Sequence, residues 1–199
     1  MSFPAADIRI LRDLAREVAE QAARDDEKAK IEQWKRFNAL DQDRPMVLIF
    51  PEGSWREALP DSELHCADPR ARQYEWHLRV RLYYRDHLQD DSVTTDVFHV
   101  PTAVRDTGWG IAANRRPSET AYGAAHFDPV IRDESDFDQK IRDPQITIDW
   151  QQTRHLLDEA HEVFDDILTV QRDGPKVCRM IVVDMLAQWR GLDQLFLDM

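Results

Sequence analysis

Short β-like runs alternate along this chain with helical stretches, and this order constrains the fold more than any other feature. The runs are Met46–Phe50, Val93–Val100 and Ile167–Gln171. Strands that are separated by helices pair in parallel through right-handed crossover connections. The order therefore predicts an α/β fold built on a parallel sheet. Met46–Phe50 is apolar throughout, which is typical of a strand covered on both faces.

Four stretches place apolar residues at the three- and four-residue spacing of a helix. In the first stretch a charged segment, Arg24–Lys30, interrupts the apolar stripe, so one long helix and two shorter helices both remain open. Asp149 is the expected N-cap of the third stretch. The predicted helical stretches are Ala5–Asn38, Pro69–Leu88, Asp149–Phe164 and a region from about Val177 that breaks at Gly191.

The section from Thr102 to Ile148 is too long for a plain connector in a compact domain. It contains the sequence Gly-Trp-Gly at 108–110, two short β-like runs, and a capping-box candidate formed by Ser135 and Asp138. We therefore expect this section to carry extra structure or to form part of a site.

Composition excludes several classes of protein. The chain has 199 residues and a formal net charge of −12, which argues against a generic nucleic-acid or anionic-membrane binder. No run of apolar residues is long enough to span a bilayer, and no secretory signal is visible. The two cysteines, Cys66 and Cys178, lack the spacing of metal ligands. We expect a cytoplasmic protein that acts on a small molecule and has no structural metal site. A homodimer remains an open alternative.

Only three strands of the parallel kind can be counted, and a three-stranded parallel sheet rarely stands alone. The chain ends in a helical run, Gly191–Met199, that carries no stop signal. We therefore expect the chain to be the front part of a larger domain.

Three segments resemble the uroporphyrinogen decarboxylase-like superfamily, which also contains corrinoid-linked methyltransferases. Arg44-Pro45 before Met46–Phe50 is similar to the RPVWFMRQ opening of the decarboxylases. Asp96–Ala103 is similar to their S-D-I-L-V-V-P-x-A segment, and Ile167–Pro175 is similar to their strand leading to G-G-P-x-T-L. The resemblance covers about residues 31–199 and implies the N-terminal portion of a (β/α)8 TIM barrel that is incomplete in this chain. Residues 1–40 would then form a preceding helical segment and residues 41–199 the first βα units.

The resemblance also implies roles for particular residues. In the decarboxylases the aspartate that matches Asp96 stabilises positive charge on a protonated pyrrole, which is electrostatic catalysis. The arginine-rich loop that binds the substrate's carboxylates in that family is replaced here by Phe50–Arg56, which contains Glu52. This replacement argues against uroporphyrinogen itself as the substrate. In the methyltransferase branch, zinc or a corrinoid would take part, but its histidine and cysteine ligands lie in the later half of the barrel.

Ionisable and aromatic residues near the predicted strand ends are the candidate site residues, because α/β enzymes place their chemistry there. Each candidate also has a purely structural alternative: Glu52 could be a solvated loop acid, His99 a core histidine, Arg105 and Asp106 an ion pair, and Trp109 a packing residue. The catalytic candidates are Asp96, Glu52 and His99; the substrate-binding candidates are Arg105, Trp109, His126 and Arg172, the last beside Asp173 at the end of its strand.

We expect an enzyme of this superfamily, a methyltransferase or decarboxylase with an unidentified substrate, seen as a fragment. The alternatives are a truncated non-catalytic α/β domain that acts by binding a partner, and a complete small α/β binding domain. An open sheet edge would serve the truncated form as its binding surface.

Overall fold

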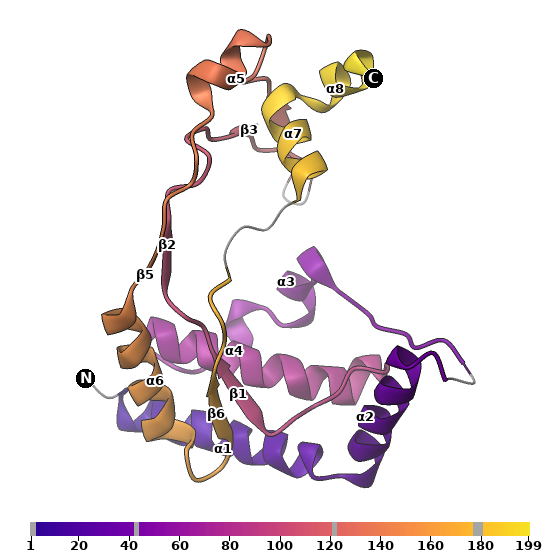
Figure 1. The fold of residues 1–199 in the computed structure, drawn as a ribbon. Coiled ribbons are helices and arrows are strands. Elements are labelled where there is room, and N and C mark those ends of the chain that lie inside the picture. The colour runs from indigo at the N-terminus through magenta and orange to yellow at the C-terminus, as the bar shows by residue number, and fades with distance from the viewer. Residues whose placement is uncertain (1–2, 42–43, 121–122, 177–180) are drawn as a thin grey trace. The chain divides into compact units, whose positions relative to one another are not determined.

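The computed structural model describes residues 3–41, 44–120, 123–176 and 181–199. Helices and strands are mixed along the chain, as the α/β prediction requires. The residues divide into two compact units (Figure 1). The first unit comprises Met1–Val100 and Arg154–Asp173, and the second comprises Pro101–Thr153 and Gly174–Met199. None of the three boundaries lies at residue 40, where the sequence predicts the end of a separate helical segment.

Helices dominate the first unit. The first predicted helical stretch forms two helices that meet at Ala23 and Arg24, and the predicted helix 69–88 is present with a π-helical last turn. The Asp68 carboxylate caps the start of that helix by accepting the N–H groups of Arg70 and Ala71. The elements are α1 (Ala5–Ala22), α2 (Asp25–Asn38), η1 (Glu52–Ser54), α3 (Trp55–Ala58), η2 (Asp61–Glu63), α4 (Pro69–Tyr83), η3 (Tyr84–Leu88) and most of α6 (Trp150–Phe164).

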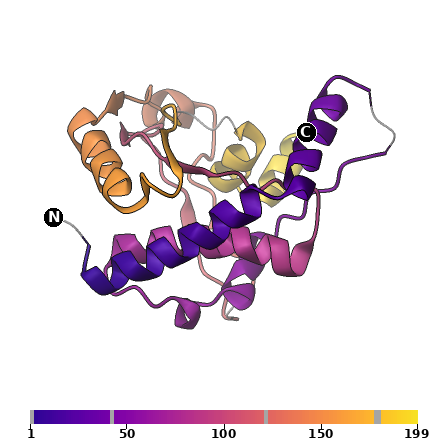
Figure 2. The same ribbon diagram turned by 90° about the horizontal axis from the view of Figure 1, so that it is seen from below.

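The core of the first unit lies where α1, α4, α6 and strand β1 (Val97–Val100) meet. The α1 and α4 helices pack side by side, as Figure 2 shows. Leu11 and Val18 of α1 lie two turns apart and are fully buried, which explains the apolar stripe in the sequence. Phe98 and Phe164 stack at a centroid distance of 4.4 Å and fill the space between strand and helix.

A two-stranded parallel sheet confirms the predicted parallel pairing of the second and third runs. Strand β1 pairs with β6 (Thr169–Arg172), with Val97 opposite Thr169 and Val100 opposite Arg172. The β1 side chains alternate, so Phe98 and Val100 are buried while His99 is exposed. The predicted strand began at Val93, but residues 93–96 are outside the strand.

The predicted strand at Met46–Phe50 is wrong. The segment is not paired in any sheet, and Val47 and Phe50 are 54% and 71% exposed. Its hydrogen bonds are made with the carboxylates of Asp90 and Asp91, the backbone N–H of Asp91 and the hydroxyl of Tyr84, not with a neighbouring strand. The described residues contain three two-stranded sheets and no TIM barrel.

The second unit contains the extra structure that the long section 102–148 predicts. Strand β2 (Val104–Asp106) pairs antiparallel with β5 (Ile146–Ile148), and β3 (Asn114–Arg116) pairs antiparallel with β4 (His126–Asp128). Two helices, α7 (Val182–Arg190) and α8 (Leu192–Asp198), follow, and they break at Gly191 as predicted, with φ at +80°. The predicted start of this helical region, 177–180, lies outside the described residues.

The capping box predicted at Ser135 and Asp138 is wrong. Ser135 begins α5 (Ser135–Lys140), but its N–H and hydroxyl both donate to the Asp133 carboxylate. The Asp136 carboxylate, and not that of Asp138, accepts the N–H of Arg132. The predicted N-cap of α6 is confirmed, because Asp149 accepts the N–H of Gln152 at 2.9 Å.

Candidate active site

A histidine and an aspartate meet at the carboxyl ends of the two parallel strands. His99 lies near the end of β1, and Asp173 directly follows β6. Their side chains are joined by a hydrogen bond of 2.7 Å between His99 Nδ1 and Asp173 Oδ1. The backbone N–H of Asp173 donates to the carbonyl of Val100 at 2.8 Å, which extends the parallel ladder and fixes Asp173 beside β1.

The strand alternation determines where this pair points. Phe98 and Val100 occupy the buried side of β1, so His99 must project from the opposite, uncovered face. The side chains of His99 and Asp173 are 47% and 22% exposed, so a small molecule can reach them. Carboxyl ends of parallel strands are the usual site of chemistry in α/β proteins.

The geometry suits proton transfer. An ionised carboxylate can only accept hydrogen bonds, so Asp173 holds the His99 ring with a hydrogen on Nδ1. That tautomer leaves Nε2 as the nitrogen that exchanges a proton with a bound molecule. Arg172, the last residue of β6, is exposed at the same edge, in register with Val100.

The other two catalytic candidates of the first unit lie elsewhere. Asp96 precedes β1 at the amino end of the strand, is exposed, and contributes its carbonyl to the N–H of Thr169. Asp96 lies three positions before His99, which corresponds to about 10 Å along an extended strand. Glu52 begins the turn η1 with φ at +49° and does not follow a strand. The structure therefore brings His99 together with Asp173, whereas Arg172, in register with the buried Val100, belongs to the opposite face of the strand pair and Asp96 lies at its other end.

The remaining candidates belong to the second unit. Arg105 is 79% exposed and pairs with Asp149 at 2.8 Å, so the alternative of an Arg105–Asp106 pair is wrong. The carbonyl of Trp109 accepts the N–H of Arg142, and glycines with positive φ flank this half-buried residue. His126 is exposed on β4, with Nε2 at 3.4 Å from an oxygen of Asp128.

The sequence indicates both His99 and Asp173 as strand-end residues but does not indicate their contact. The signal was present, because both residues lie at the carboxyl ends of runs that were predicted to be parallel. Adjacent parallel strands in register place such residues beside each other. What was missing was the order of the strands, since Met46–Phe50 was expected in the same sheet.

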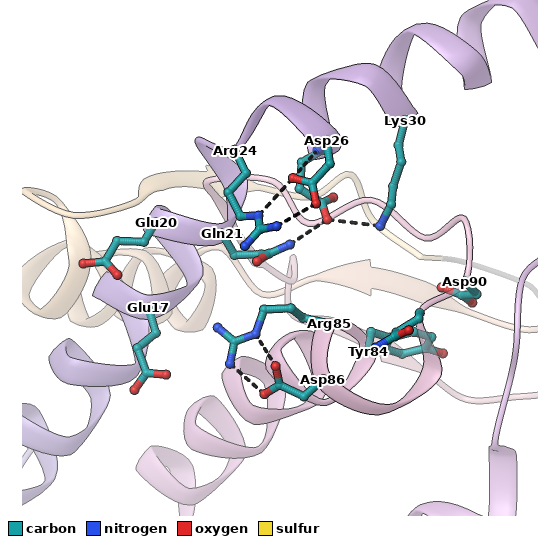
Figure 3. A pocket seen from close by; sticks show the side chains of 12 residues that line it. Glu17, Glu20, Gln21, Arg24, Asp26, Lys30, Tyr84, Arg85, Asp86 and Asp90 are labelled. Atoms are coloured by element: carbon teal, nitrogen blue, oxygen red, sulfur yellow. Dashed lines mark hydrogen bonds and ion pairs between the residues drawn. The ribbon is translucent and has the colours of Figure 1, made fainter.

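An open groove of about 800 Å³ lies between the α1–α2 corner and the end of α4 (Figure 3). Four of its charged side chains form two ion pairs, Arg24 with Asp26 and Arg85 with Asp86, while Glu17 and Glu20 also line it. Glu27 is 1% exposed and accepts hydrogen bonds from Gln21 and Lys30 at its edge. Most of the polar groups of the groove thus serve structural pairs, and it is a weaker candidate site than the His99 edge.

Among the described residues, no three His, Cys, Asp or Glu side chains gather in a group that could hold a metal ion. No helix in the described ranges has the length and apolar character needed to cross a membrane. No family model, curated protein sequence or solved structure matches this chain.

Proposed function

We propose that this chain forms part of an enzyme of the uroporphyrinogen decarboxylase-like superfamily, in which the His99–Asp173 pair transfers a proton. The hydrogen bond of 2.7 Å between the two side chains, at the carboxyl ends of two parallel strands, is the observation that carries the proposal. The proposal includes a small-molecule substrate and a cytoplasmic location.

The parallel pair also supports the finer fold that the resemblance implies. Strands β1 and β6 correspond to the second and third segments of that resemblance. In the proposed fold they are neighbouring strands of a (β/α)8 barrel. Their buried face packs on helices, as the outside of a barrel does, and the His99 face would line the interior.

Proton transfer is common to both reactions of the superfamily. A decarboxylase must protonate the carbon that loses carbon dioxide, and a thiol methyltransferase must remove the proton of the thiol. His99 would exchange this proton through Nε2 while Asp173 fixes the ring and stabilises the imidazolium. The residues that the structure describes offer no set of side chains that could hold zinc.

The substrate is proposed to carry an anionic group. Arg172 ends β6 in register with Val100, one residue before Asp173, and is the proposed partner of a substrate carboxylate. Uroporphyrinogen is expected to bind poorly, because the loop at 50–56 presents Glu52 and a single arginine, Arg56, to a molecule with many carboxylates.

The experiment assays the full chain for loss of carbon dioxide from small carboxylic acids with fewer carboxylates than uroporphyrinogen, and for methyl transfer from methylcobalamin to a small thiol. His99→Gln and Asp173→Asn should each abolish most of whichever activity is found. His161→Gln is the matched control, because His161 makes a similar hydrogen bond of 3.0 Å to Asp165 on the surface of α6. The control should keep full activity.

An independent readout is the tautomer of His99, which nitrogen-15 NMR reports from the shifts of the two ring nitrogens. We expect a hydrogen on Nδ1 in the unmodified chain and a mixture of tautomers in Asp173→Asn. The proposal is wrong if Asp173→Asn changes neither the tautomer nor the activity. Absence of both activities would instead favour a domain that acts by binding a partner.

A further inference from the structure

The uncovered face of the β1–β6 pair carries a second polar side chain beside His99. Residues that face each other on two parallel strands place their side chains on the same side of the sheet. Phe98 faces Val170, and both pack in the core of the first unit. His99 faces Gln171, so the side chain of Gln171 projects from the same uncovered face as the imidazole. Neighbouring strands lie about 4.8 Å apart, which brings the two side chains within reach of one small molecule.

The amide of Gln171 is available to bind another molecule. Gln171 is exposed, and its side chain makes no hydrogen bond or ion pair with any residue in the described ranges. By contrast, the side chains of His99 and Asp173 are joined to each other on this face. A glutamine amide offers two N–H donors and one carbonyl acceptor. The face therefore presents a ring that can exchange a proton and, beside it, an unused hydrogen-bond donor.

The two strands add no cation to this face. Arg172 is on the opposite face of the pair. Apart from Asp173, which holds the His99 ring, the side chains that β1 and β6 place on the uncovered face are uncharged: Val97, Thr169 and Gln171. Of these, Gln171 is the one that faces His99. Negative charge that develops on a molecule bound beside His99 therefore meets a neutral donor, the Gln171 amide.

Proton transfer to or from carbon needs a donor of this kind. When a bond to a carbon next to a carbonyl breaks, its electron pair moves to the carbonyl oxygen and forms an enolate. A hydrogen-bond donor placed at that oxygen stabilises the enolate, and glutamine side chains are among the groups that serve this purpose. The imidazole handles the proton at the carbon, so the oxygen requires a second group. Two side chains that face each other across neighbouring strands suit two adjacent atoms of one substrate.

We propose that Gln171 is the oxyanion donor of the His99 site and that the substrate is a small β-keto acid. This inference rests on the proposed function, because it requires the His99–Asp173 pair to transfer the proton. The bond between the carboxylate and the neighbouring carbon breaks, carbon dioxide leaves, and the electron pair of that bond forms the enolate. The enolate oxygen accepts an N–H of Gln171. The enolate carbon then takes the proton from Nε2 of the protonated His99, which regains a proton from solvent.

The ketone oxygen is what selects this class of acid. In a β-keto acid the ketone carbon is bonded directly to the carbon that loses carbon dioxide and receives the proton. The hydrogen bond from Gln171 strengthens as the ketone oxygen gains charge, so it stabilises the transition state more than the bound substrate. An acid without this oxygen gives Gln171 no developing charge to stabilise.

The experiment measures carbon dioxide release from acetoacetate by the full chain. The unmodified chain should exceed the rate in buffer alone, and His99→Gln should fall to that rate. Gln171→Leu removes the donor and should lower kcat roughly 100-fold with KM nearly unchanged. Gln73→Leu is the matched control and should keep full activity, because Gln73 is an exposed glutamine on α4 whose side chain also makes no hydrogen bond with the described residues.

Two further measurements separate a role in the chemistry from a role in the structure. Gln171→Leu should leave the nitrogen-15 shifts of the His99 ring unchanged, because Asp173 sets the tautomer. Gln171→Glu keeps the size of the side chain, but an ionised carboxylate cannot donate, so this variant should lose at least as much activity as Gln171→Leu. Circular dichroism confirms that each variant folds.

Three results would overturn the inference: no release of carbon dioxide from acetoacetate above the rate in buffer, an unchanged kcat in Gln171→Leu, or a raised KM as its only effect. The proposed function fails separately. Methyl transfer, or carbon dioxide release from another acid, that depends on His99 and Asp173 but not on Gln171 would keep the pair and remove Gln171 as its donor. Activity that survives His99→Gln would remove the pair itself.

Discussion

Replacing Glu75 by glutamine should destabilise the first unit strongly. Glu75 lies on α4 with no exposed surface. Its carboxylate accepts the backbone N–H groups of His65 and Cys66, both at 2.8 Å, and the Nε–H of Arg79 at 2.8 Å. Burial alone would raise the pKa of Glu75, but the hydrogen bonds from Cys66, His65 and Arg79 lower it overall. The folded chain therefore holds the charged form.

The size of this loss in the free energy of unfolding follows from which carboxylate oxygen of Glu75 accepts which N–H donor. One oxygen, Oε1, serves Arg79 and His65; the other, Oε2, serves Cys66 and His65. Glutamine turns one oxygen into an NH₂ group, which cannot accept. Whichever oxygen is kept, Arg79 or the Cys66 N–H loses its acceptor, at a cost of roughly 1–3 kcal/mol. The remaining bonds also lose their charge assistance, so we expect a total loss of about 3 kcal/mol.

Urea unfolding followed by circular dichroism measures this loss, with Glu162→Gln as the matched control. Glu162 is exposed on α6, so the control should stay within about 0.5 kcal/mol of the unmodified chain. The sign of the pH dependence follows from the lowered pKa. The stabilisation from Glu75 is fully present above its unfolded value of 4.5 and is lost as the pH falls through the lower folded value. A loss below about 1 kcal/mol at neutral pH would refute the reasoning.

Two further predictions concern buried groups of the same core. Burial raises the pKa of Glu159, against the opposing charges of Arg70 and His155; Arg70 Nε lies 2.9 Å from one carboxylate oxygen as an ion pair, but neither oxygen accepts a hydrogen bond of good geometry. Stability therefore falls as the pH rises through the folded-state pKa of Glu159. Glu159→Gln should leave the free energy of unfolding at neutral pH unchanged or raised. A clear decrease in that free energy, measured by urea unfolding, would contradict this. Burial, followed by the charge of Glu75, raises the pKa of Cys66 to about 12. In a Cys178→Ser background, the native chain should react with a thiol reagent at pH 8 far more slowly than the unfolded chain, and equal rates would count against the burial of Cys66.

Periodicity predicted most of the helices because their burial follows directly from the spacing of apolar residues. The stripe of Leu11 and Val18 and the N-cap at Asp149 are local signals, and both agree with the structure. The prediction of a buried strand at Met46–Phe50 was wrong because an apolar run of this length has the composition of a buried strand whether or not a neighbour covers it. Pairing depends on distant residues, which periodicity does not report.

The candidate site shows the same division between local and distant information. The residue types at the ends of β1 and β6 were visible in the sequence, and so was their parallel direction. The contact between His99 and Asp173 also required that no strand lie between β1 and β6. The resemblance of Asp96–Ala103 to a decarboxylase segment indicated Asp96 instead, which lies at the opposite end of the strand. A resemblance in sequence therefore identified the correct strand but did not identify the pair at its carboxyl end.

Buried carboxylates explain how a chain with so few paired strand residues holds in place the ends of β1 and β6 where His99 and Asp173 meet. Asp7 of α1 accepts the N–H groups of Ala67 and Asp68 just before α4 begins. Glu27 of α2 accepts the N–H of Thr94 at 2.8 Å, three residues before β1 begins. Both acids are nearly inaccessible to solvent, whereas an acid on a helix ordinarily indicates a solvated face. The direction of β1, and with it the orientation of His99, thus depends on charged side chains that apolar periodicity alone does not reveal.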